Sequence, residues 1–248
     1  MISKTDALVL RALDYGETSR IVTLYSRRFG KLAVMARGAR RPGSRIAACL
    51  QPLAYIDVVL YYRAGRELQY LSECAFVRPM PRWEEDWERR ACGLLLLEWL
   101  DRITPSGEPN AALFNWALRA LQSLYEGTGQ ARTWVLLFLL RALPLIGYGL
   151  RLEREGTSGP WAFEETEGRL VARRKAGARA RPISDGAIAA LEHLIEAPVE
   201  RVQHLVIPVR LWDELMEHVG AFLQAHLGPL PPVRSWEVFQ RMVLFKAG

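Results

Sequence analysis

The chain has 248 residues, of which 50% are apolar and 24% are charged, and its formal net charge is +6 at pH 7. Such a chain can bury a sizeable core as one large domain or two smaller ones, which excludes a disordered or low-complexity protein. Its three scattered cysteines include no CxxC pair, so they exclude a disulfide framework and a zinc site made of cysteine alone. This cysteine usage favours a reducing cytoplasm.

The N-terminal third has the residue pattern of β-strands. Segments that alternate apolar and polar positions, or are rich in β-branched and aromatic residues, lie at 7–13, 20–26, 30–38, 54–63 and 66–77. Five short antiparallel strands with no long helix among them predict a small closed barrel. The OB-fold is the commonest nucleic-acid-binding barrel of this kind, and an SH3-like barrel is the alternative that the pattern leaves open.

The pattern changes at RPMPRW (78–83), where two prolines interrupt the strands. We place a domain boundary near Arg82 and predict an OB-fold domain at 1–82 and an α-helical domain at 83–248. Helical periodicity is found at 83–103, 111–127, 131–149, 184–197, 208–228 and 235–245. The predicted fold class is therefore α+β with more than one domain.

Some helices carry further signals. Pro144 interrupts or ends the third helix, and Ser184 or Asp185 is expected to cap the fourth. The apolar run WVLLFLL (134–140) is far shorter than the ~20 residues of a membrane span, so it predicts a buried helix and no membrane partner. The first residues, MISKTDALVL, lack the pattern of a signal peptide.

Residues 150–182 interrupt the helical pattern of the C-terminal part. The segment is polar, rich in glycine and without a helical period. It predicts a loop or a β-excursion inserted between helices.

Positive charge is concentrated in the N-terminal part. Residues 1–82 hold 14 basic and 6 acidic side chains, whereas residues 83–248 hold 19 and 21. No acidic residue occurs between Glu17 and Asp57, and RGARRPGSR (37–45) alone carries four arginines. Eight basic residues lie in this interval: Arg20, Arg27, Arg28, Lys31, Arg37, Arg40, Arg41 and Arg45. A solvated loop could carry them, but so much like charge repels itself unless an anion is nearby, which favours a nucleic-acid partner.

Aromatic residues on or beside the predicted strands could stack on the bases of a single strand. They are Tyr25, Phe29, Tyr55, Tyr61, Tyr62 and Tyr70. Burial in the barrel core is the alternative for each. Strand alternation turns Tyr61 and Tyr62 to opposite faces, so at most one of these two is expected to be exposed.

Catalytic motifs are absent from the sequence. The four histidines, all in the helical part, form no HExxH motif, and there is no GxSxG elbow, GxxxxGK[ST] loop or GxGxxG after a strand. The carboxylates of EEDWE (84–88) could bind a metal, but acids at the start of a helix are more simply complements of its dipole. The sequence therefore predicts a protein that is not an enzyme and needs no cofactor.

Several motifs resemble one known family. The segment LDYGETSRIVTLYSRRFGKLAVMARGARRPGSR (13–45) resembles the N-terminal segment of the bacterial recombination mediator family RecO. LQPL (50–53), LLFLLRALPLIGYG (136–149) and HLGPLPPVRSWEVF (226–239) agree with later segments of that family. The likeness spans nearly the whole chain in the same order.

The resemblance implies a DNA repair and recombination protein of the bacterial cytoplasm and nucleoid, acting in the RecF pathway. RecO-like proteins bind single- and double-stranded DNA and anneal complementary strands. With RecR they help RecA to load on strands coated by single-stranded DNA-binding protein. The resemblance implies DNA contacts by the same eight basic residues. It also implies a pocket for the acidic tail of the single-stranded DNA-binding protein, for whose rim Arg119, Arg132 and Arg141 are candidates.

The sequence departs from the family at a zinc site that many RecO-like proteins carry. Their two cysteine pairs would fall at Glu155 and Ser158, and near Ala172 and Lys175. These residues cannot supply four thiolates, so we expect no zinc. The excursion must then be held by packing around Trp161, Phe163 and Leu170, or be mobile.

One other class of function fits the same composition. The protein could be an interaction adaptor whose basic barrel contacts an acidic protein partner rather than DNA. A nuclease or ligase is a third reading. The face of the barrel that binds DNA, the docking site of RecR and the oligomeric state do not follow from the sequence.

Overall fold

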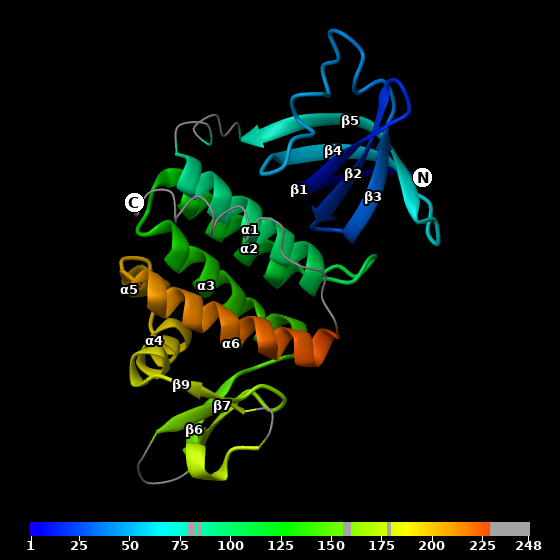
Figure 1. Cartoon of the computed structure of the whole chain (residues 1–248). Helices are drawn as coiled ribbons and strands as arrows, with labels where there is room; N and C mark the ends of the chain where they lie inside the picture. The colour runs from blue at the N-terminus through cyan, green and yellow to red at the C-terminus, as the bar shows by residue number, and fades with distance from the viewer. Residues whose placement is uncertain (79–82, 84–85, 156–159, 178–179, 229–248) are drawn as a thin grey trace. The chain divides into compact units, whose positions relative to one another are not determined.

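The computed structural model of the chain describes residues 1–78, 83, 86–155, 160–177 and 180–228. These residues form two compact units, one of residues 1–125 and one of residues 126–228 (Figure 1). The first unit contains the strands β1 to β5 and the helices α1 and α2. The second contains the remaining elements.

The first unit is built on a closed five-stranded barrel. Its strands are β1 (Ile2–Tyr15), β2 (Ser19–Ser26), β3 (Gly30–Ala36), β4 (Tyr55–Tyr61) and β5 (Leu68–Arg78). The strand order around the barrel is β1-β2-β3-β5-β4, and β4 pairs with β1 to close it. All neighbours are antiparallel except β3 and β5, which are parallel. This five-stranded barrel confirms the predicted OB-fold.

Alternation along the strands places one face of each strand in the barrel core. Val22 and Leu24 of β2 and Val34 of β3 have no exposed surface and belong to this core. The residues at alternate positions on these strands, such as Ile21 and Met35, lie outside the core cluster. Since side chains alternate with a period of two, the second set points outward from the barrel.

Two helices follow the barrel in the same unit. Helix α1 (Trp87–Ile103) begins after Asp86, whose carboxylate accepts a hydrogen bond of 3.1 Å from the backbone N–H of Arg89. Helix α2 (Ala111–Glu126) begins after Asn110, whose side-chain oxygen accepts a hydrogen bond of 2.9 Å from the N–H of Leu113. Both are N-caps of the usual kind.

Helix α2 and the loop before it pack against the outer surface of the barrel. The ring of Phe114 stacks on that of Tyr25, with centroids 6.0 Å apart, and lies 6.4 Å from that of Tyr55. The loop contacts β3, where the N–H of Gly107 donates to the carbonyl of Lys31 (2.8 Å). These contacts bury Tyr25 completely.

The second unit combines helices with a small sheet. Helices α3 (Ala131–Ala142), α4 (Asp185–Glu196) and α6 (Val209–Leu227) contact one another, and the short α5 (Val199–Val202) precedes α6. Helix α3 ends at Ala142, just before Pro144, which begins the 3-10 turn η2 (Pro144–Ile146), and residues 134–140 are buried as expected. Ser184 caps α4 by accepting a hydrogen bond of 3.2 Å from the N–H of Ala187.

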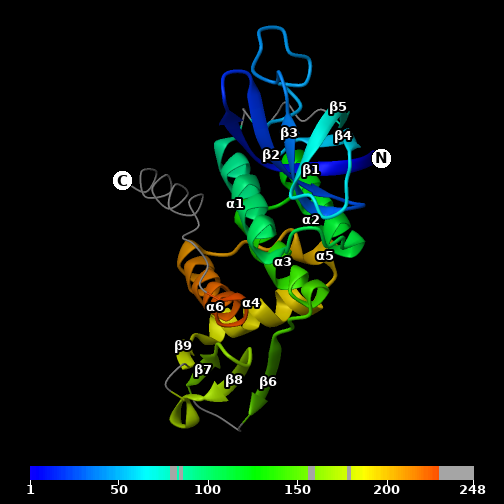
Figure 2. The ribbon, with the colours of Figure 1, turned by 90° about the vertical axis from the view of Figure 1, so that its right-hand side faces the viewer.

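The excursion between α3 and α4 is a four-stranded sheet. Its strands are β6 (Arg151–Glu155), β7 (Trp161–Glu164), β8 (Arg169–Ala172) and β9 (Ala180–Ile183), in the order β6-β8-β7-β9, with the 3-10 turn η3 (Arg173–Lys175) after β8. Figure 2 shows this sheet beside α4 and α6. Trp161, Phe163 and Leu170 are buried, and the Phe163 ring meets the edge of the His218 ring on α6. These three residues pack as the first of the two alternatives for this excursion requires.

Parts of the sequence prediction remain open. The boundary near Arg82 and the helix at 235–245 lie outside the described residues. The division into domains at residue 82 stays a prediction, and α1 and α2 cluster with the barrel in the structure. Within the described ranges, no helix is long and apolar enough to cross a membrane.

Candidate nucleic-acid interface

The eight basic residues of the barrel lie at two opposite ends of the hairpin formed by β2 and β3. Arg20 pairs with Ala36 at one end, and Ser26 pairs with Gly30 at the other. At ~3.3 Å per residue these ends are about 20 Å apart. Arg20, Arg37, Arg40, Arg41 and Arg45 belong to the first end, and Arg27, Arg28 and Lys31 to the second. The eight residues therefore do not form a single patch.

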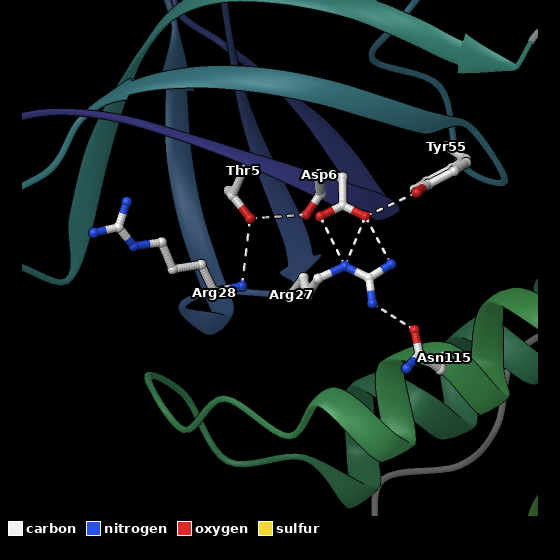
Figure 3. A network of polar contacts seen from close by, with 6 residues as sticks. All are labelled: Thr5, Asp6, Arg27, Arg28, Tyr55 and Asn115. Atoms are coloured by element: carbon white, nitrogen blue, oxygen red, sulfur yellow. Dashed lines mark hydrogen bonds and ion pairs between the residues drawn. The ribbon is translucent and has the colours of Figure 1, made fainter.

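At the second end, Arg27 belongs to a network that joins the barrel to α2 (Figure 3). Its Nε donates to both carboxylate oxygens of Asp6 (3.0 Å each), and its Nη1 donates to the side chain of Asn115 on α2. The hydroxyl of Tyr55 donates to Asp6 as well (2.8 Å). Figure 3 shows the neighbouring Arg28 side chain pointing away from this network.

Lys31 at the same end is bound to α1. Its ammonium group lies 3.1 Å from a carboxylate oxygen of Asp101 and also donates to the Asp101 carbonyl. The side chain of Lys31 is 16% exposed. Arg11 of β1 reaches the other oxygen of the same carboxylate (3.3 Å). Arg27 and Lys31 thus hold α1 and α2 to the barrel, and their predicted contact with DNA stays a prediction.

At the first end, Asp14 neutralises two of the arginines. Its carboxylate lies 3.0 Å from the Nε of Arg20 and 3.2 Å from the Nε of Arg40. Arg40 also donates to the backbone carbonyl of Gly16 (2.9 Å). These contacts fix the base of the loop that carries the other arginines.

The remaining arginines of this end have no carboxylate within ion-pair distance in the part of the chain that the structure describes. They are Arg37, Arg41 and Arg45, all exposed, in residues 37–45, which we call the arginine loop. Figures 1 and 2 show the segment between β3 and β4 projecting from the end of the barrel away from α1 and α2. Gly38 and Gly43 have left-handed backbone angles, with φ of 70° and 76°, which suit glycine in these turns.

Tyr70 of β5 contacts two guanidinium groups, one of them from this loop. Those of Arg37 and Arg66 are each centred 4.5 Å from the centre of its ring. The charge of Arg37 is the largest cause of the lowered pKa of the Tyr70 phenol, followed by a hydrogen bond with Arg66. Arg66 was not among the predicted residues because it lies outside the acid-free interval, in the loop between β4 and β5.

Tyr70 is part of a row of outward-facing side chains that crosses all five strands. Leu13 pairs with Ile21, Ile21 with Met35, Met35 with Tyr70 and Tyr70 with Tyr61. Side chains at such paired positions are neighbours on one surface. Leu13 and Tyr61 are 57% and 53% exposed. We call these five residues the Tyr70 row.

The other aromatic candidates are engaged in packing. Tyr25 and Tyr55 are buried against Phe114, and burial raises the pKa of Tyr25 to about 12. Phe29 and Tyr62 stack on each other with centroids 4.2 Å apart. Tyr61 is exposed and Tyr62 is half-buried, in agreement with the expected alternation. Of the six aromatic candidates, Tyr61 and Tyr70 are thus the two outside this packing.

The three helical arginines predicted for partner binding have different surroundings. Arg119 is exposed on α2. Arg132 on α3 lies near Asp213, where its charge acts to lower the pKa of that carboxyl against the larger, opposite effect of burial. The guanidinium of Arg141 donates to the carbonyls of Leu194 (3.1 Å) and Ala197 at the end of α4. Arg141 therefore satisfies the last carbonyls of that helix.

The residues at the family's zinc positions do not fit a zinc ion. Ser158 is outside the described residues, and Ala172 and Lys175 carry no thiolate or imidazole. Across the described ranges, no three His, Cys, Asp or Glu side chains gather as a metal site would require.

The fold and this surface define a protein with an N-terminal OB-fold barrel, a basic loop at one end of it and a helical region after it. Residues 1–80 match the family described as Recombination protein O N terminal, and residues 84–237 match Recombination protein O C terminal. The chain belongs to the RecO family.

Individual relatives agree with this assignment. The DNA repair protein RecO of Pelotomaculum thermopropionicum is 34% identical over 231 residues, covering 90% of this chain and 89% of that one. That of Chloroherpeton thalassium is 26% identical over 258 residues, covering 98% and 100%. That of Salinibacter ruber is 46% identical over 123 residues, which is 50% of this chain and 47% of the relative.

Proposed function

We propose that this protein acts in DNA repair and homologous recombination by binding single- and double-stranded DNA and annealing complementary strands. With RecR it would promote RecA loading on strands coated by single-stranded DNA-binding protein, in the bacterial cytoplasm at the nucleoid. The membership of the RecO family supports this role. The observation that carries it is the set of three exposed arginines, Arg37, Arg41 and Arg45, that pair with no carboxylate of the described residues, one of which, Arg37, lies over the ring of Tyr70.

The proposed mechanism is charge neutralisation on the arginine loop. Each arginine that contacts a phosphate releases condensed counterions, which yields affinity without sequence preference. Two complementary strands repel each other in solution, and this repulsion falls when their phosphates are neutralised on one protein. No bond is made or broken in this process, so the proposal includes no catalytic residue and no cofactor.

The Tyr70 row adds contact with bases. A base that stacks on an aromatic face contributes on the order of 1–3 kcal/mol in proteins that bind single strands. Tyr70 is held in place by Arg37 and Arg66, so its ring is oriented before DNA arrives. The same two guanidinium groups can move from the ring to a phosphate when a base replaces them.

The proposed site for a protein partner lies in the helical part of the chain. The acidic tail of the single-stranded DNA-binding protein would meet basic side chains of the helical part, for which Arg119 and Arg132 are kept as candidates. Arg141 is a weaker candidate because its guanidinium already binds the end of α4.

The experiment compares two triple variants of the full chain with the same loss of charge. In the first, Arg37, Arg41 and Arg45 are replaced by Gln, and in the control Arg90, Arg201 and Arg210, which are also exposed, are replaced by Gln. Binding of a labelled single strand is measured by fluorescence anisotropy between low and moderate salt. At ~0.7 per phosphate contact, the slope of log K against log salt should fall by about 2 in the first variant only.

Two results would overturn the proposal. One is an equal slope in the two variants, which would mean that the arginine loop does not touch phosphates. The other is the absence of any complex between the wild-type protein and DNA without a partner, which is the behaviour of an adaptor for an acidic protein.

A further inference from the structure

A second basic surface lies in the other compact unit, on the sheet of residues 151–183. The 3-10 turn η3 consists of Arg173, Arg174 and Lys175, and all three residues are exposed. We call these three residues the 173–175 turn. Three adjacent cations repel one another at this spacing, so their exposure on an ordered turn requires a physical explanation.

Three glutamates in and directly after β7 are engaged by arginines other than those of the turn. Arg169 lies 3.1 Å from a carboxylate oxygen of Glu164 and 2.8 Å from one of Glu167. Arg181 pairs with Glu165 of the sheet and with Glu217 of α6. These three carboxylates are thus paired with arginines of the strands β8 and β9, and none of the three forms an ion pair with the turn.

The backbone of the turn is anchored at its start and closed by a hydrogen bond of its own. The N–H of Arg173 donates to the carbonyl of Pro160 (2.9 Å), and the N–H of Ala176 donates to the carbonyl of Arg173 (3.3 Å). Ala172, directly before the turn, is buried and pairs with Trp161 of β7. The three side chains therefore project from an anchored position, which lowers the entropy lost when they bind a ligand.

We propose that the 173–175 turn is a second site for the phosphodiester backbone of DNA. Phosphate binding requires cations and hydrogen-bond donors, and all three side chains supply both. A docked peptide would also need apolar contact, and in the described part of residues 160–183 no large apolar side chain is exposed. The inference rests on the proposed function for the identity of its ligand.

The proposal gives the protein two DNA sites on two compact units. One strand would bind the arginine loop and its complement the 173–175 turn, so that a single chain raises the local concentration of one strand beside the other. Annealing would then depend on both sites, while capture of the first strand would depend mainly on the arginine loop.

The test uses the full chain and a pair of complementary 30-nucleotide strands. In the turn variant, Arg173 and Arg174 are replaced by Gln, and in a matched control Arg201 and Arg210, exposed in the same unit, are replaced by Gln. Both variants lose two charges. With the protein saturated by the first strand, we expect annealing to slow roughly tenfold in the turn variant and to keep the wild-type rate in the control. The salt slope for binding of the second strand should fall by about 1.4 at ~0.7 per contact, while that of the first strand should keep its wild-type value.

The outcomes separate this inference from the proposed function. Wild-type annealing and salt slope in the turn variant would overturn the inference, and the arginine-loop variant would still report on the proposed function. Loss of annealing in the turn variant but not in the arginine-loop variant would support the second site and refute the first. An equal decrease in the turn variant and in the R201Q/R210Q control would refute the second site, since the effect would then follow net charge alone.

Discussion

The guanidinium of Arg27, in the turn after β2, and the carboxylate of Asp6 on β1 form a two-oxygen contact at 3.0 Å. Partial burial acts to raise the pKa of Asp6, but the hydrogen bonds from Arg27 and Tyr55 outweigh it, so the pKa lies below its ordinary value. The ring of Phe114 on α2 lies 4.4 Å below the same guanidinium. The pair therefore links the stability of the barrel to the packing of α2.

The first prediction concerns the Asp6→Asn variant. We expect its free energy of unfolding at pH 7 to fall by about 1–2 kcal/mol, because Arg27 and Tyr55 lose a charged acceptor. A depressed carboxyl pKa stabilises the fold above the unfolded-state value near 4 and ceases to do so as pH falls through the folded-state value. Urea unfolding from pH 7 down to pH 3 should thus show the difference between wild type and variant shrinking in acid. A difference that does not change with pH would contradict this account.

A second prediction concerns Asp14, which neutralises Arg20 and Arg40. Replacing Asp14 by Asn releases both guanidinium groups next to the arginine loop. We expect affinity for a single strand at low salt to rise about threefold to tenfold and the salt slope to become steeper. Glu73 is exposed on β5, and the Glu73→Gln variant, which removes the same charge, serves as the control. Anisotropy titrations in which the two variants behave alike would show that net charge, and not the local pair, sets the affinity.

The third prediction addresses Tyr70. Tyr70→Leu removes the aromatic ring that Arg37 and Arg66 contact, so the affinity for a single strand should fall roughly tenfold. Tyr70→Phe keeps the ring and should keep most of this affinity. Phe76→Leu, an exposed aromatic residue further along the same strand, is expected to leave affinity unchanged. The comparison of single- with double-stranded oligonucleotides supplies a second readout, because stacked bases in a duplex cannot reach the ring. Equal losses on both kinds of DNA would exclude stacking.

The fourth prediction concerns Gly30, where the loop before α2 approaches the barrel. Gly30 has φ of 63°, and a Cβ atom there would lie 2.1 Å from the carbonyl oxygen of Glu108. Gly30→Ala should therefore cost about 2–4 kcal/mol of stability, because the loop must move. Gly43→Ala has a similar φ of 76° but open space around it, so it should cost only the ~1 kcal/mol of the left-handed conformation. Thermal unfolding of the two variants measures the difference, and equal losses would mean that the loop contact contributes nothing.

The elements themselves were predictable because they depend on local patterns. The alternation of Val22, Leu24 and their neighbours marks a strand with one buried face, and the prolines and caps mark where helices begin and end. The limits predicted for α1, α2, α4 and α6 agree to within four residues, whereas the helix predicted over 131–149 ends at Ala142, just before the interrupting Pro144. The four-residue α5 was missed, since so short a segment has no measurable period.

The candidate site was predictable only in part. The excess of arginine in the arginine loop is a property of the sequence, and so is the absence of acids between Glu17 and Asp57. Which of the eight basic residues form ion pairs was not predictable, because their partners Asp6, Asp14 and Asp101 lie outside that interval. Asp101 is 70 residues from Lys31 along the chain.

By itself the sequence determined the barrel, the helices and the surplus of positive charge, since hydrophobic periodicity and composition act through neighbours along the chain. Only the tertiary structure decided which cations stay unpaired. Coulomb energy depends on distance in space and on exposure to water, so three aspartates brought close by folding neutralise four of the eight basic groups. Folding also placed Arg37 of the loop after β3 against Tyr70 of β5, a contact between segments that are distant along the chain.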